Sequence, residues 1–382
     1  MTTLADRSPP PPLVTRALVL VCLTLLFGAM VPNLFVLAPR FLHQRGYDER
    51  DVGAIMGAYN LASLIGMPAI AWLVARLGYA RTLAAGCLVA ACGAIVFDAG
   101  DTMGAFALAR GLMGLGFTAV LVGGAAYAAE IAPPGRLGET LGVAGVLTLS
   151  AQALGPVLGR GVLAIASWPW VFRTGIASGA IGAAIALTLP PVPTRARAEG
   201  GATGGAWLVL AATALAGLGF GAIWNFLADY APRAGVDEPT TFFVPYTLAA
   251  VGTRLGLGSL SDRIGRHRAA IPALCGHVLA LVVIALLGAP WQLALAGLGY
   301  GLCHGIYYPT LQAMVVERAG GHPGRAITVS TFAFGVGSVA AAYGLGPIAR
   351  GHGYPLIYGV AAAAGVVAAV AIAVDRPGAA RG

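Results

Sequence analysis

Four side chains that can hydrogen-bond a solute recur at a regular spacing within one apolar stretch. The residues are Tyr300, His304, Tyr308 and Gln312. A spacing of four residues, set against about 3.6 residues per helical turn, makes a slowly drifting stripe on one helix face. Hydrocarbon would offer these groups no hydrogen-bond partners, so in a membrane the stripe is expected to face a bundle interior or a water-filled cavity. The alternative is that His304 and Tyr308 only bond neighbouring helices.

Candidate groups for proton exchange are few. The sequence has 15 acidic residues, and nearly all of them fall between the apolar stretches or at their ends. Asp229, late in one stretch, is the acid best placed to reach a cavity, so we name Asp229 and His304 as proton-exchanging candidates. Capping at the membrane interface is the alternative role for Asp229. Because His277 and His304 are isolated from any acid on their own helices and no H-E-x-x-H sequence occurs, we expect no enzyme, metal site or cofactor.

The composition places these residues in a membrane. Of the 382 residues, 58% are hydrophobic and 10% are charged, and the mean hydropathy is +0.81, whereas a soluble domain carries roughly 25% charged residues. All basic residues are arginine and lie between apolar runs rather than in one patch, so the net charge of +8 does not indicate nucleic-acid binding. The five cysteines fall inside apolar runs, which favours buried packing over disulfides.

Apolar runs long enough to span a bilayer recur along the whole chain. Residues 191–204, rich in Pro, Gly and charge, separate these runs into two sets and are expected to form a cytoplasmic linker. We therefore predict an N-terminal six-helix bundle, residues 1–190, and a C-terminal six-helix bundle, residues 205–382. Most loop arginines then lie on the side of both termini, which predicts that both termini are cytoplasmic. The predicted spans are 16–38, 52–75, 80–99, 103–130, 138–164, 170–190, 205–230, 240–261, 267–288, 290–316, 325–349 and 354–374.

The two halves resemble degenerate copies of each other. The motif Arg-x-Gly at 76–78 recurs at 263–265, an offset of 187 residues (263 minus 76), and three further matches keep the same order at similar offsets. Ordered matches at nearly one offset predict parallel repeats of six helices. The further matches are Glu130 with Glu317, Gly155-Pro156 with Gly346-Pro347, and Ala38-Pro39-Arg40 with Ala231-Pro232-Arg233.

The loop between the eighth and ninth predicted spans carries the most specific motif. The segment Gly258-Ser-Leu-Ser-Asp262-Arg263-Ile-Gly265-Arg266-His-Arg268 resembles the loop signature G-x-L-x-D-R-x-G-R-[RK] of the major facilitator superfamily at every defining position. The equivalent loop of the first half has Ala75 where the family usually has Asp. The residues that we expect to gate the cytoplasmic side are Asp262, Arg263, Arg266, Glu317, Arg76, Arg81 and Glu130. Asp262 would face the positive end of the fifth span, although anchoring of a loop is the alternative role.

Two further elements resemble the same family. Arg110-Gly-Leu-Met-Gly114-Leu-Gly116, in the fourth span, is similar to its R-x-x-x-G-x-G element. An arginine at this depth is expected to face a cavity or a partner, unless it snorkels to the outer interface. In the fifth span, Gly155-Pro156-Val-Leu-Gly159-Arg160 is close to the G-P-x-x-G-G element associated with exporters, with Arg160 in place of the last glycine. Gly155, Pro156 and Gly159 would equally serve helix packing alone.

The resemblance implies both a fold and a mode of action. The fold would be an all-α polytopic membrane protein, with twelve transmembrane helices in two pseudo-symmetric six-helix bundles that rock by alternating access around a central site. Because the nearest group is the sugar and drug efflux permeases of the drug:proton antiporter type, we expect proton-coupled efflux of a small molecule by a monomer in the bacterial inner membrane. The alternatives are an importer and a non-transporting sensor or scaffold. In the family the first, fourth, seventh and tenth spans line the cavity, which would bring Asn33, Arg110 and Asn225 opposite the tenth-span stripe.

Overall fold

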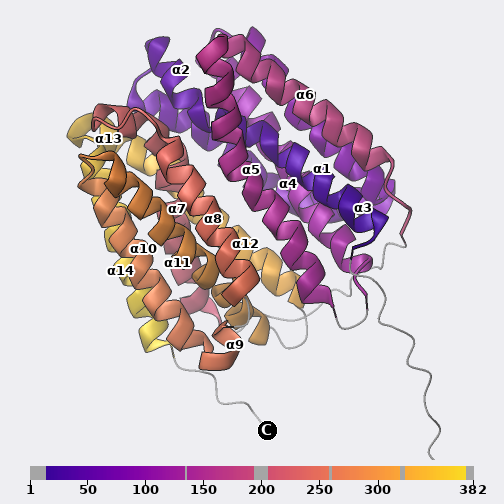
Figure 1. The fold of residues 1–382 in the computed structure, drawn as a ribbon. Coiled ribbons are helices and arrows are strands. Elements are labelled where there is room, and N and C mark those ends of the chain that lie inside the picture. The colour runs from indigo at the N-terminus through magenta and orange to yellow at the C-terminus, as the bar shows by residue number, and fades with distance from the viewer. Residues whose placement is uncertain (1–13, 134–135, 193–204, 258–259, 319–322, 376–382) are drawn as a thin grey trace, which may run out of the picture.

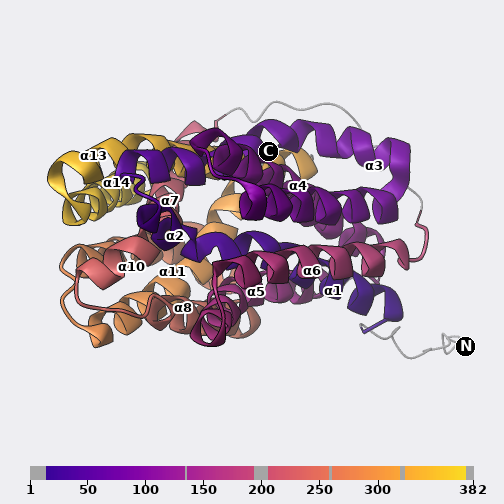
Figure 2. The ribbon, with the colours of Figure 1, turned by 90° about the horizontal axis from the view of Figure 1, so that it is seen from above.

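The computed structural model describes residues 14–133, 136–192, 205–257, 260–318 and 323–375. Figure 1 shows two groups of long helices lying side by side, and Figure 2 shows the same two groups from above. Within the described residues the secondary structure is helical and contains no strand. The prediction of an all-α protein with two helix bundles is confirmed, whereas most of the predicted linker 191–204 lies outside the described residues.

The N-terminal bundle contains six membrane-length segments. Its elements are α1 (Arg16–Leu34), η1 (Phe35–Leu37), α2 (Ala38–Gln44), α3 (Glu49–Ala99), α4 (Met103–Glu130), α5 (Leu137–Ile165) and α6 (Trp168–Leu187). The first three elements follow one another without a loop, so the first span runs on to Gln44 instead of ending at 38 as predicted. Pro39 permits this continuation because it occupies the first turn of α2, where a missing N–H costs little.

The C-terminal bundle repeats this plan. Its elements are α7 (Trp207–Arg233), α8 (Thr240–Leu257), α9 (Leu260–Ile264), α10 (Arg266–Ala285), α11 (Pro290–Glu317), α12 (Pro323–Ala340), the π-helical η2 (Ala341–Leu345), α13 (Gly346–His352) and α14 (Tyr354–Val374). The elements α12, η2 and α13 also follow one another without a loop, and the membrane-length helix continues to His352 rather than to 349 as predicted. The predicted spans 103–130 and 354–374 coincide with α4 and α14.

Glycines with a left-handed backbone recur at equivalent places in the two halves. Gly78 has a φ of 75° and bends α3 sharply, so the second and third spans meet at one residue without a loop. Gly265, 187 residues later (265 minus 78), has a φ of 95° and separates α9 from α10. A side chain with a Cβ is strained at such a φ, which explains the glycine at both positions. The backbone thus repeats where the sequence motif repeats.

Ten described segments are long and apolar enough to cross a membrane, and α8 and α11 complete the twelve. These two helices carry polar side chains such as Arg254 and His304, which lower their hydropathy.

Each bundle has a core of its own, such as the ring cluster of Phe35, Phe97 and Phe172 in the N-terminal bundle. Large apolar side chains remain exposed on the outside of both bundles, as expected of surfaces that contact lipid.

Candidate functional site

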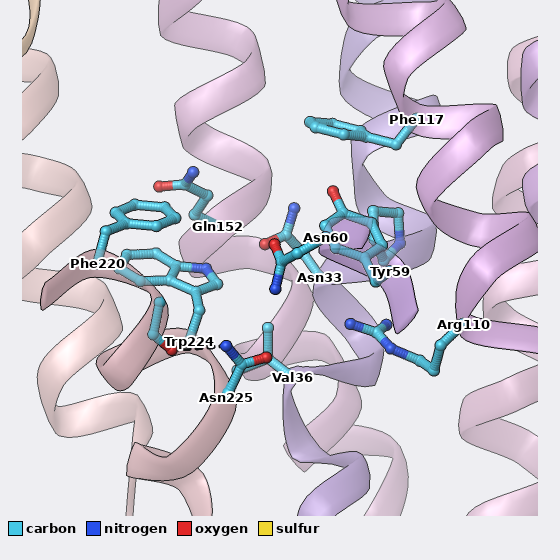
Figure 3. Close-up of a pocket in the computed structure, with 12 residues that line it drawn as sticks. Asn33, Val36, Tyr59, Asn60, Arg110, Phe117, Gln152, Phe220, Trp224 and Asn225 are labelled. Carbon is cyan, nitrogen blue, oxygen red and sulfur yellow. Dashed lines mark hydrogen bonds between the residues drawn. The ribbon is translucent and has the colours of Figure 1, made fainter. Parts of the chain in front are cut away.

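A cavity lies between the two bundles and encloses about 570 Å³ of space, part of it continuous with solvent. Its wall comes from α1, η1, α3, α4 and α5 on one side and from α7 on the other (Figure 3). Because both bundles contribute to the wall, any movement of one bundle against the other changes the shape of the cavity. Three of the seven predicted binding residues line it: Asn33, Arg110 and Asn225.

Asn33 and Asn225 are equivalent residues of the two halves, 192 positions apart (225 minus 33). In each case the amide Nδ2 donates to the carbonyl oxygen four residues earlier, Ala29 or Gly221, at 2.7 Å. These bonds fix how the two amides are turned. Figure 3 shows both amides facing the cavity, so their oxygens are acceptors that a bound molecule can reach.

Arg110 brings a positive charge to the cavity wall. Its side chain is only 4% exposed, and its guanidinium carbon lies 4.8 Å from the ring centroid of Tyr59. Its Nη1 is 3.7 Å from the sulfur of Met113, and its Nε has no hydrogen-bond partner in the described structure. Figure 3 shows the guanidinium pointing towards the two asparagines. The predicted orientation of Arg110 towards a cavity agrees with this geometry.

Aromatic rings form two opposite parts of the wall (Figure 3). Phe220 and Trp224 of α7 stack with their centroids 4.0 Å apart and their planes 9° apart. Tyr59 of α3 and Phe117 of α4 face them from the N-terminal bundle, with centroids 6.0 Å apart. The sequence reasoning did not identify these rings, because aromatic residues in apolar spans cannot be told from core residues by type.

The tenth-span stripe contributes to packing in this conformation rather than to the cavity wall. Tyr300 is fully buried, and its ring contacts those of His277 and Tyr246. His304 is also buried, and its Nδ1 shares a hydrogen bond of 2.8 Å with the Tyr246 hydroxyl. Further along α11, Gln312 donates to the Tyr308 hydroxyl at 3.2 Å. A substrate-binding role for the stripe stays a prediction.

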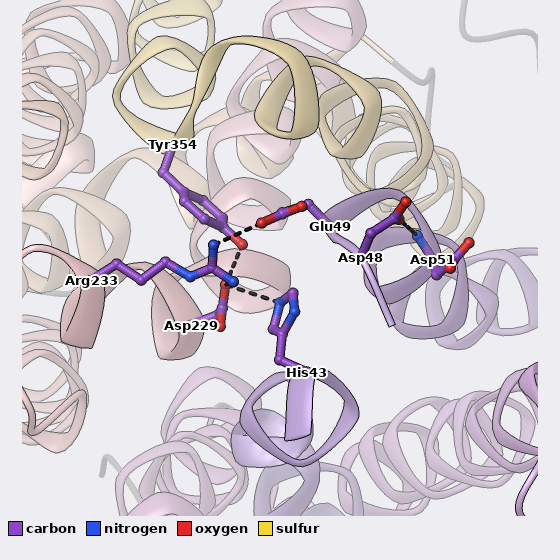
Figure 4. Close-up of polar contacts among 7 residues, drawn as sticks. All are labelled: His43, Asp48, Glu49, Asp51, Asp229, Arg233 and Tyr354. Carbon is purple, nitrogen blue, oxygen red and sulfur yellow. Dashed lines mark hydrogen bonds and ion pairs between the residues drawn. The ribbon is translucent and has the colours of Figure 1, made fainter. Parts of the chain in front are cut away.

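A polar network joins the bundles at the end of the molecule that carries α2 and α13 (Figure 4). Asp229 of α7 lies at its centre with an 8% exposed side chain; it accepts a hydrogen bond from Tyr354 and lies 3.2 Å from Nη2 of Arg233. Across the bundle interface, the Asp229 carboxylate is 3.0 Å from Nε2 of His43, and Arg233 donates to Glu49 at 2.7 Å. Asp229 therefore lies in a buried polar site at the bundle interface and not in the cavity wall, and its role in proton exchange stays a prediction.

Two more ion pairs cross between the bundles at this end. Arg350 of α13 lies 3.1 Å from Asp48, and Arg160 of α5 pairs with Glu238. Asp48 also caps α3, and the backbone N–H of Asp51 holds the pKa of the Asp48 carboxyl below its usual value, with Arg350 adding to the effect. This end is also held by close backbone packing, because a Cβ on Gly53 would lie 2.7 Å from the carbonyl oxygen of Ala342.

The opposite end, near α9, holds the predicted gating residues of the second half. Arg266 lies 2.8 Å from Glu317, and its Nη1 donates to Ser261 at 2.7 Å. Both contacts stay within the C-terminal bundle. The side chain of Asp262 lies outside the described residues, and Arg263 is exposed. A gating role for these residues stays a prediction.

Three of the predicted gating residues belong to the first half. The Arg76 guanidinium lies 4.8 Å from the ring centroid of Trp72, on the same helix. Arg81 is exposed, and Glu130 is half-buried where α4 ends. The gating role predicted for Arg76, Arg81 and Glu130 also stays a prediction.

Asp375 anchors the end of α14 at the α9 end of the protein. It pairs with Arg318 and lies 3.1 Å from Nε2 of His267. Burial by itself would raise the pKa of Asp375, but the hydrogen bonds from Arg318 and His267 outweigh burial and hold the pKa below its usual value. No sequence pattern indicates this cluster, because its members are distant along the chain.

The glycines of the fifth span allow α5 to contact α1. A Cβ on Gly155 would lie 2.6 Å from the Cβ of Asn33, and one on Gly159 would lie 3.1 Å from Leu37. Pro156 lies inside α5 without interrupting it. Close packing of α5 behind the cavity residue Asn33 therefore explains the glycines at 155 and 159. The link of this motif to export stays a prediction.

The fold and the site together define a class of protein: a polytopic helical membrane protein whose two related bundles enclose a cavity and are joined at one end by ion pairs. The family model "Major Facilitator Superfamily" matches residues 16–342 and 209–381, and the chain belongs to that superfamily. This confirms the family resemblance and the predicted fold.

Curated relatives from Escherichia coli (strain K12) include two described as uncharacterized transporters. The chain is 25% identical to the MFS-type transporter YhhS over 270 residues, which cover 68% of this chain and 65% of YhhS. It is 29% identical to YebQ over 143 residues, which cover 37% of this chain and 31% of YebQ. The chain thus spans about one third to two thirds of the length of these relatives. Their descriptions agree with the prediction that the chain is not an enzyme.

Two solved structures share the fold over nearly the whole chain. A mutant form of the nucleoside transporter NupG is 14% identical with a TM-score of 0.78, and the match covers 95% of this chain and 100% of that one. The human organic anion transporter MFSD10 (TETRAN) is 17% identical with a TM-score of 0.69, and the match covers 94% of this chain and 99% of that one. At these identities the likeness concerns the fold alone.

Proposed function

We propose that this chain is a secondary active transporter that moves a small organic molecule across a membrane by alternating access. One observation carries the proposal: both bundles contribute to the wall of one cavity, and ion pairs between the bundles lie at one end of it. Each bundle has an apolar cluster made only of its own residues, so rocking one bundle against the other would break the crossing pairs without unfolding these clusters.

The distribution of arginine supports an orientation. With both termini in the cytoplasm, the end carrying α2 and α13 is the outer end, and the crossing pairs form an outer gate made of His43–Asp229, Glu49–Arg233, Asp48–Arg350 and Arg160–Glu238. The described conformation is then closed to the outside. We place the protein in a bacterial cytoplasmic membrane and propose that it works as a monomer, since one chain supplies the whole cavity wall.

Proton coupling would act through Asp229. Protonation of this carboxyl removes the charge that attracts His43 across the interface and Arg233 within the C-terminal bundle. A proton arriving from outside would therefore weaken the outer gate and favour opening outwards, where substrate is released. After substrate release the protein would return to the conformation closed to the outside, and loss of the proton to the cytoplasm from that conformation would restore the charge of Asp229 and the gate. This order of events exchanges protons for substrate and corresponds to export.

The test is flux in proteoliposomes that contain the purified full chain. With an imposed pH gradient, a panel of radiolabelled drugs, sugars and organic acids should include a solute that moves against the direction of proton flow. Asp229→Asn should retain binding of that solute and lose the response to the gradient, while Asp98→Asn, which alters an ion pair within one bundle, should behave like the parent protein. If no solute moves and a cysteine in the outer gate has the same accessibility at every pH, the proposal is wrong. Accumulation that rises in cells and collapses with an uncoupler would indicate import instead.

A further inference from the structure

We propose that the cavity binds an organic anion. The ligand would have an acidic group for Arg110, hydroxyl or N–H donors for Asn33 and Asn225, and a flat apolar part against Trp224. This inference rests on the proposed transport function and specifies the substrate class that the same cavity takes.

The first reason is the uncompensated charge of Arg110. The side chain is almost fully buried at membrane depth, and its Nε has no partner within the described structure. The sulfur of Met113 and the ring of Tyr59 are weak substitutes for an anion. Burying a guanidinium without a counter-ion is costly. A ligand that brings the missing negative charge would remove this cost when it binds.

The second reason is that the cavity wall holds no acid among its described residues. The acid nearest along a wall-forming helix is Asp229, one turn beyond Asn225. It is already paired with Arg233 and accepts a hydrogen bond from Tyr354. A cationic ligand would therefore meet Arg110 and no compensating carboxylate, so the wall would repel it.

A second arginine, which is half-buried, adds positive charge between the bundles. Arg254 of α8 lies where α8 meets α5, and its Nη1 is 3.2 Å from the place that a Cβ on Gly145 would occupy. Its Nε is also buried without a partner in the described structure. Because this position is towards the α9 end, an anion approaching from that end would be attracted before it reached Arg110.

The third reason is the direction of the neutral polar groups. The bonds to Ala29 and Gly221 use one N–H of each Nδ2, which leaves the second N–H of each amide as a donor and both oxygens as acceptors. The Oε1 of Gln152 on the same wall is buried and has no donor within the described structure. Three acceptors and two spare amide N–H groups beside one cation suit a ligand that has O–H or N–H donors as well as an acidic group.

The aromatic residues define the remaining shape. Phe220 and Trp224 stack nearly parallel on one side, and Tyr59 and Phe117 stand on the other (Figure 3). A planar ring bound beside these aromatic side chains would gain stacking contact with little loss of conformational freedom. The site therefore suits hydroxylated aromatic carboxylates better than flexible fatty acids.

Calorimetric titration of the purified full chain in nanodiscs tests the inference with three matched probes. They are 4-hydroxybenzoate, the neutral 4-hydroxybenzamide and the cationic tyramine. We expect the carboxylate to bind at least tenfold more tightly than the amide, and tyramine to bind more weakly than both. Arg110→Gln should lower the affinity for the carboxylate at least tenfold and leave that for the amide unchanged, whereas Arg110→Lys should keep part of the preference. Arg173→Gln, at an exposed arginine outside the cavity, is the control and should bind like the parent protein.

Thermal unfolding tests whether a loss of binding in Arg110→Gln is caused by loss of the folded structure. Because the charge of Arg110 is uncompensated in the empty protein, Arg110→Gln should unfold at the same or a higher temperature without ligand. Addition of 4-hydroxybenzoate should raise the midpoint of the parent protein and not that of Arg110→Gln. A lower midpoint for ligand-free Arg110→Gln together with an unchanged preference for carboxylate would overturn the inference.

Failure of this inference is distinguishable from failure of the transport function. Equal binding of carboxylate and amide, tightest binding of tyramine, or no binding of 4-hydroxybenzoate would each refute the anion assignment. If 4-hydroxybenzamide or tyramine still changes the accessibility of a cysteine at position 36 on the cavity wall, the alternating-access function stands and only the substrate class is wrong.

Discussion

The outer gate can be weakened from the N-terminal bundle alone by the double change His43→Gln and Glu49→Gln. This variant leaves Asp229 bonded to Arg233 and Tyr354 within the C-terminal bundle. Of the four pairs that cross between the bundles, it removes His43–Asp229, at 3.0 Å, and Glu49–Arg233, at 2.7 Å. The other two, Asp48–Arg350 and Arg160–Glu238, stay in place. We therefore expect the conformational equilibrium to shift towards the outward-open state while both bundles remain folded.

The exposure of the side chains sets the size of the effect. His43 and Asp229 are 16% and 8% exposed, and although Nε2 of His43 makes no hydrogen bond in the described structure, losing its ion pair with Asp229 when the imidazole is protonated should cost about 1.5 kcal/mol of closed-state stability. Arg233 is 45% exposed, and solvent screening reduces the contribution of its pair with Glu49 to about 0.5 kcal/mol. The sum of about 2 kcal/mol corresponds to a roughly 30-fold shift in the open-to-closed ratio.

Labelling of a cavity cysteine from outside measures this shift. In a background without the five native cysteines, Val36→Cys places a thiol on the cavity wall, and a membrane-impermeant maleimide is added to spheroplasts. The double variant should be labelled roughly 30-fold faster than its parent, in proportion to the open population. Asp98→Asn disturbs an ion pair within the N-terminal bundle and serves as the control. A rate within twofold of the parent, or an equal acceleration by Asp98→Asn, would refute the reasoning.

Three further changes test other parts of the molecule. Gly53→Val introduces a Cβ at 2.7 Å from the Ala342 carbonyl oxygen and should speed labelling in the same assay, whereas Gly104→Val, at a site with open space, should not. Asp375→Asn should lower the free energy of unfolding at pH 7 by about 1–2 kcal/mol. Because the folded-state pKa of Asp375 is lowered, this stabilisation is present above the unfolded-state pKa of about 4 and disappears as the pH falls through the folded-state pKa. Denaturation of both proteins in micelles at pH 7 and pH 3 would measure the difference. Asp262→Asn should reduce flux with unchanged abundance on immunoblots, and normal flux with normal labelling would contradict its gating role.

The spans could be predicted because bilayer thickness imposes a length and a polarity on each of them. The ends were harder, since Arg40 and His43 look like loop residues although the helix continues through them to Gln44. The sharp bend at Gly78 was also not predicted, because the hydropathy of a residue does not depend on its backbone φ. Sequence pattern thus reports burial in lipid well and local backbone geometry poorly.

The site was predicted in part, and the division has a physical reason. Asn33, Arg110 and Asn225 line the cavity; they could be named from sequence because polar groups at membrane depth are conspicuous and family resemblance placed their helices around a central site, while their binding of substrate stays a prediction. The ion pairs that cross between the bundles were not predicted, and Asp229 was named only as a candidate for proton exchange. Those pairs join residues such as Glu49 and Arg233, 184 positions apart, and only the docking of one bundle on the other brings such pairs together.

The tenth-span stripe connects to the cavity through one layer of side chains. The Tyr246 hydroxyl bonds Nδ1 of His304, and the Tyr246 ring meets the edge of Trp224 with centroids 5.1 Å apart. His304 also lies 5.5 Å from the ring of Phe220. The stripe therefore packs behind the aromatic wall of the cavity in this conformation. A polar helix face that the sequence assigns to a cavity can thus be buried in the layer next to the cavity. A change at His304 would then act on a bound ring through the tilt of Trp224 and Phe220, whereas a change at Asn225 would act on the bound molecule directly.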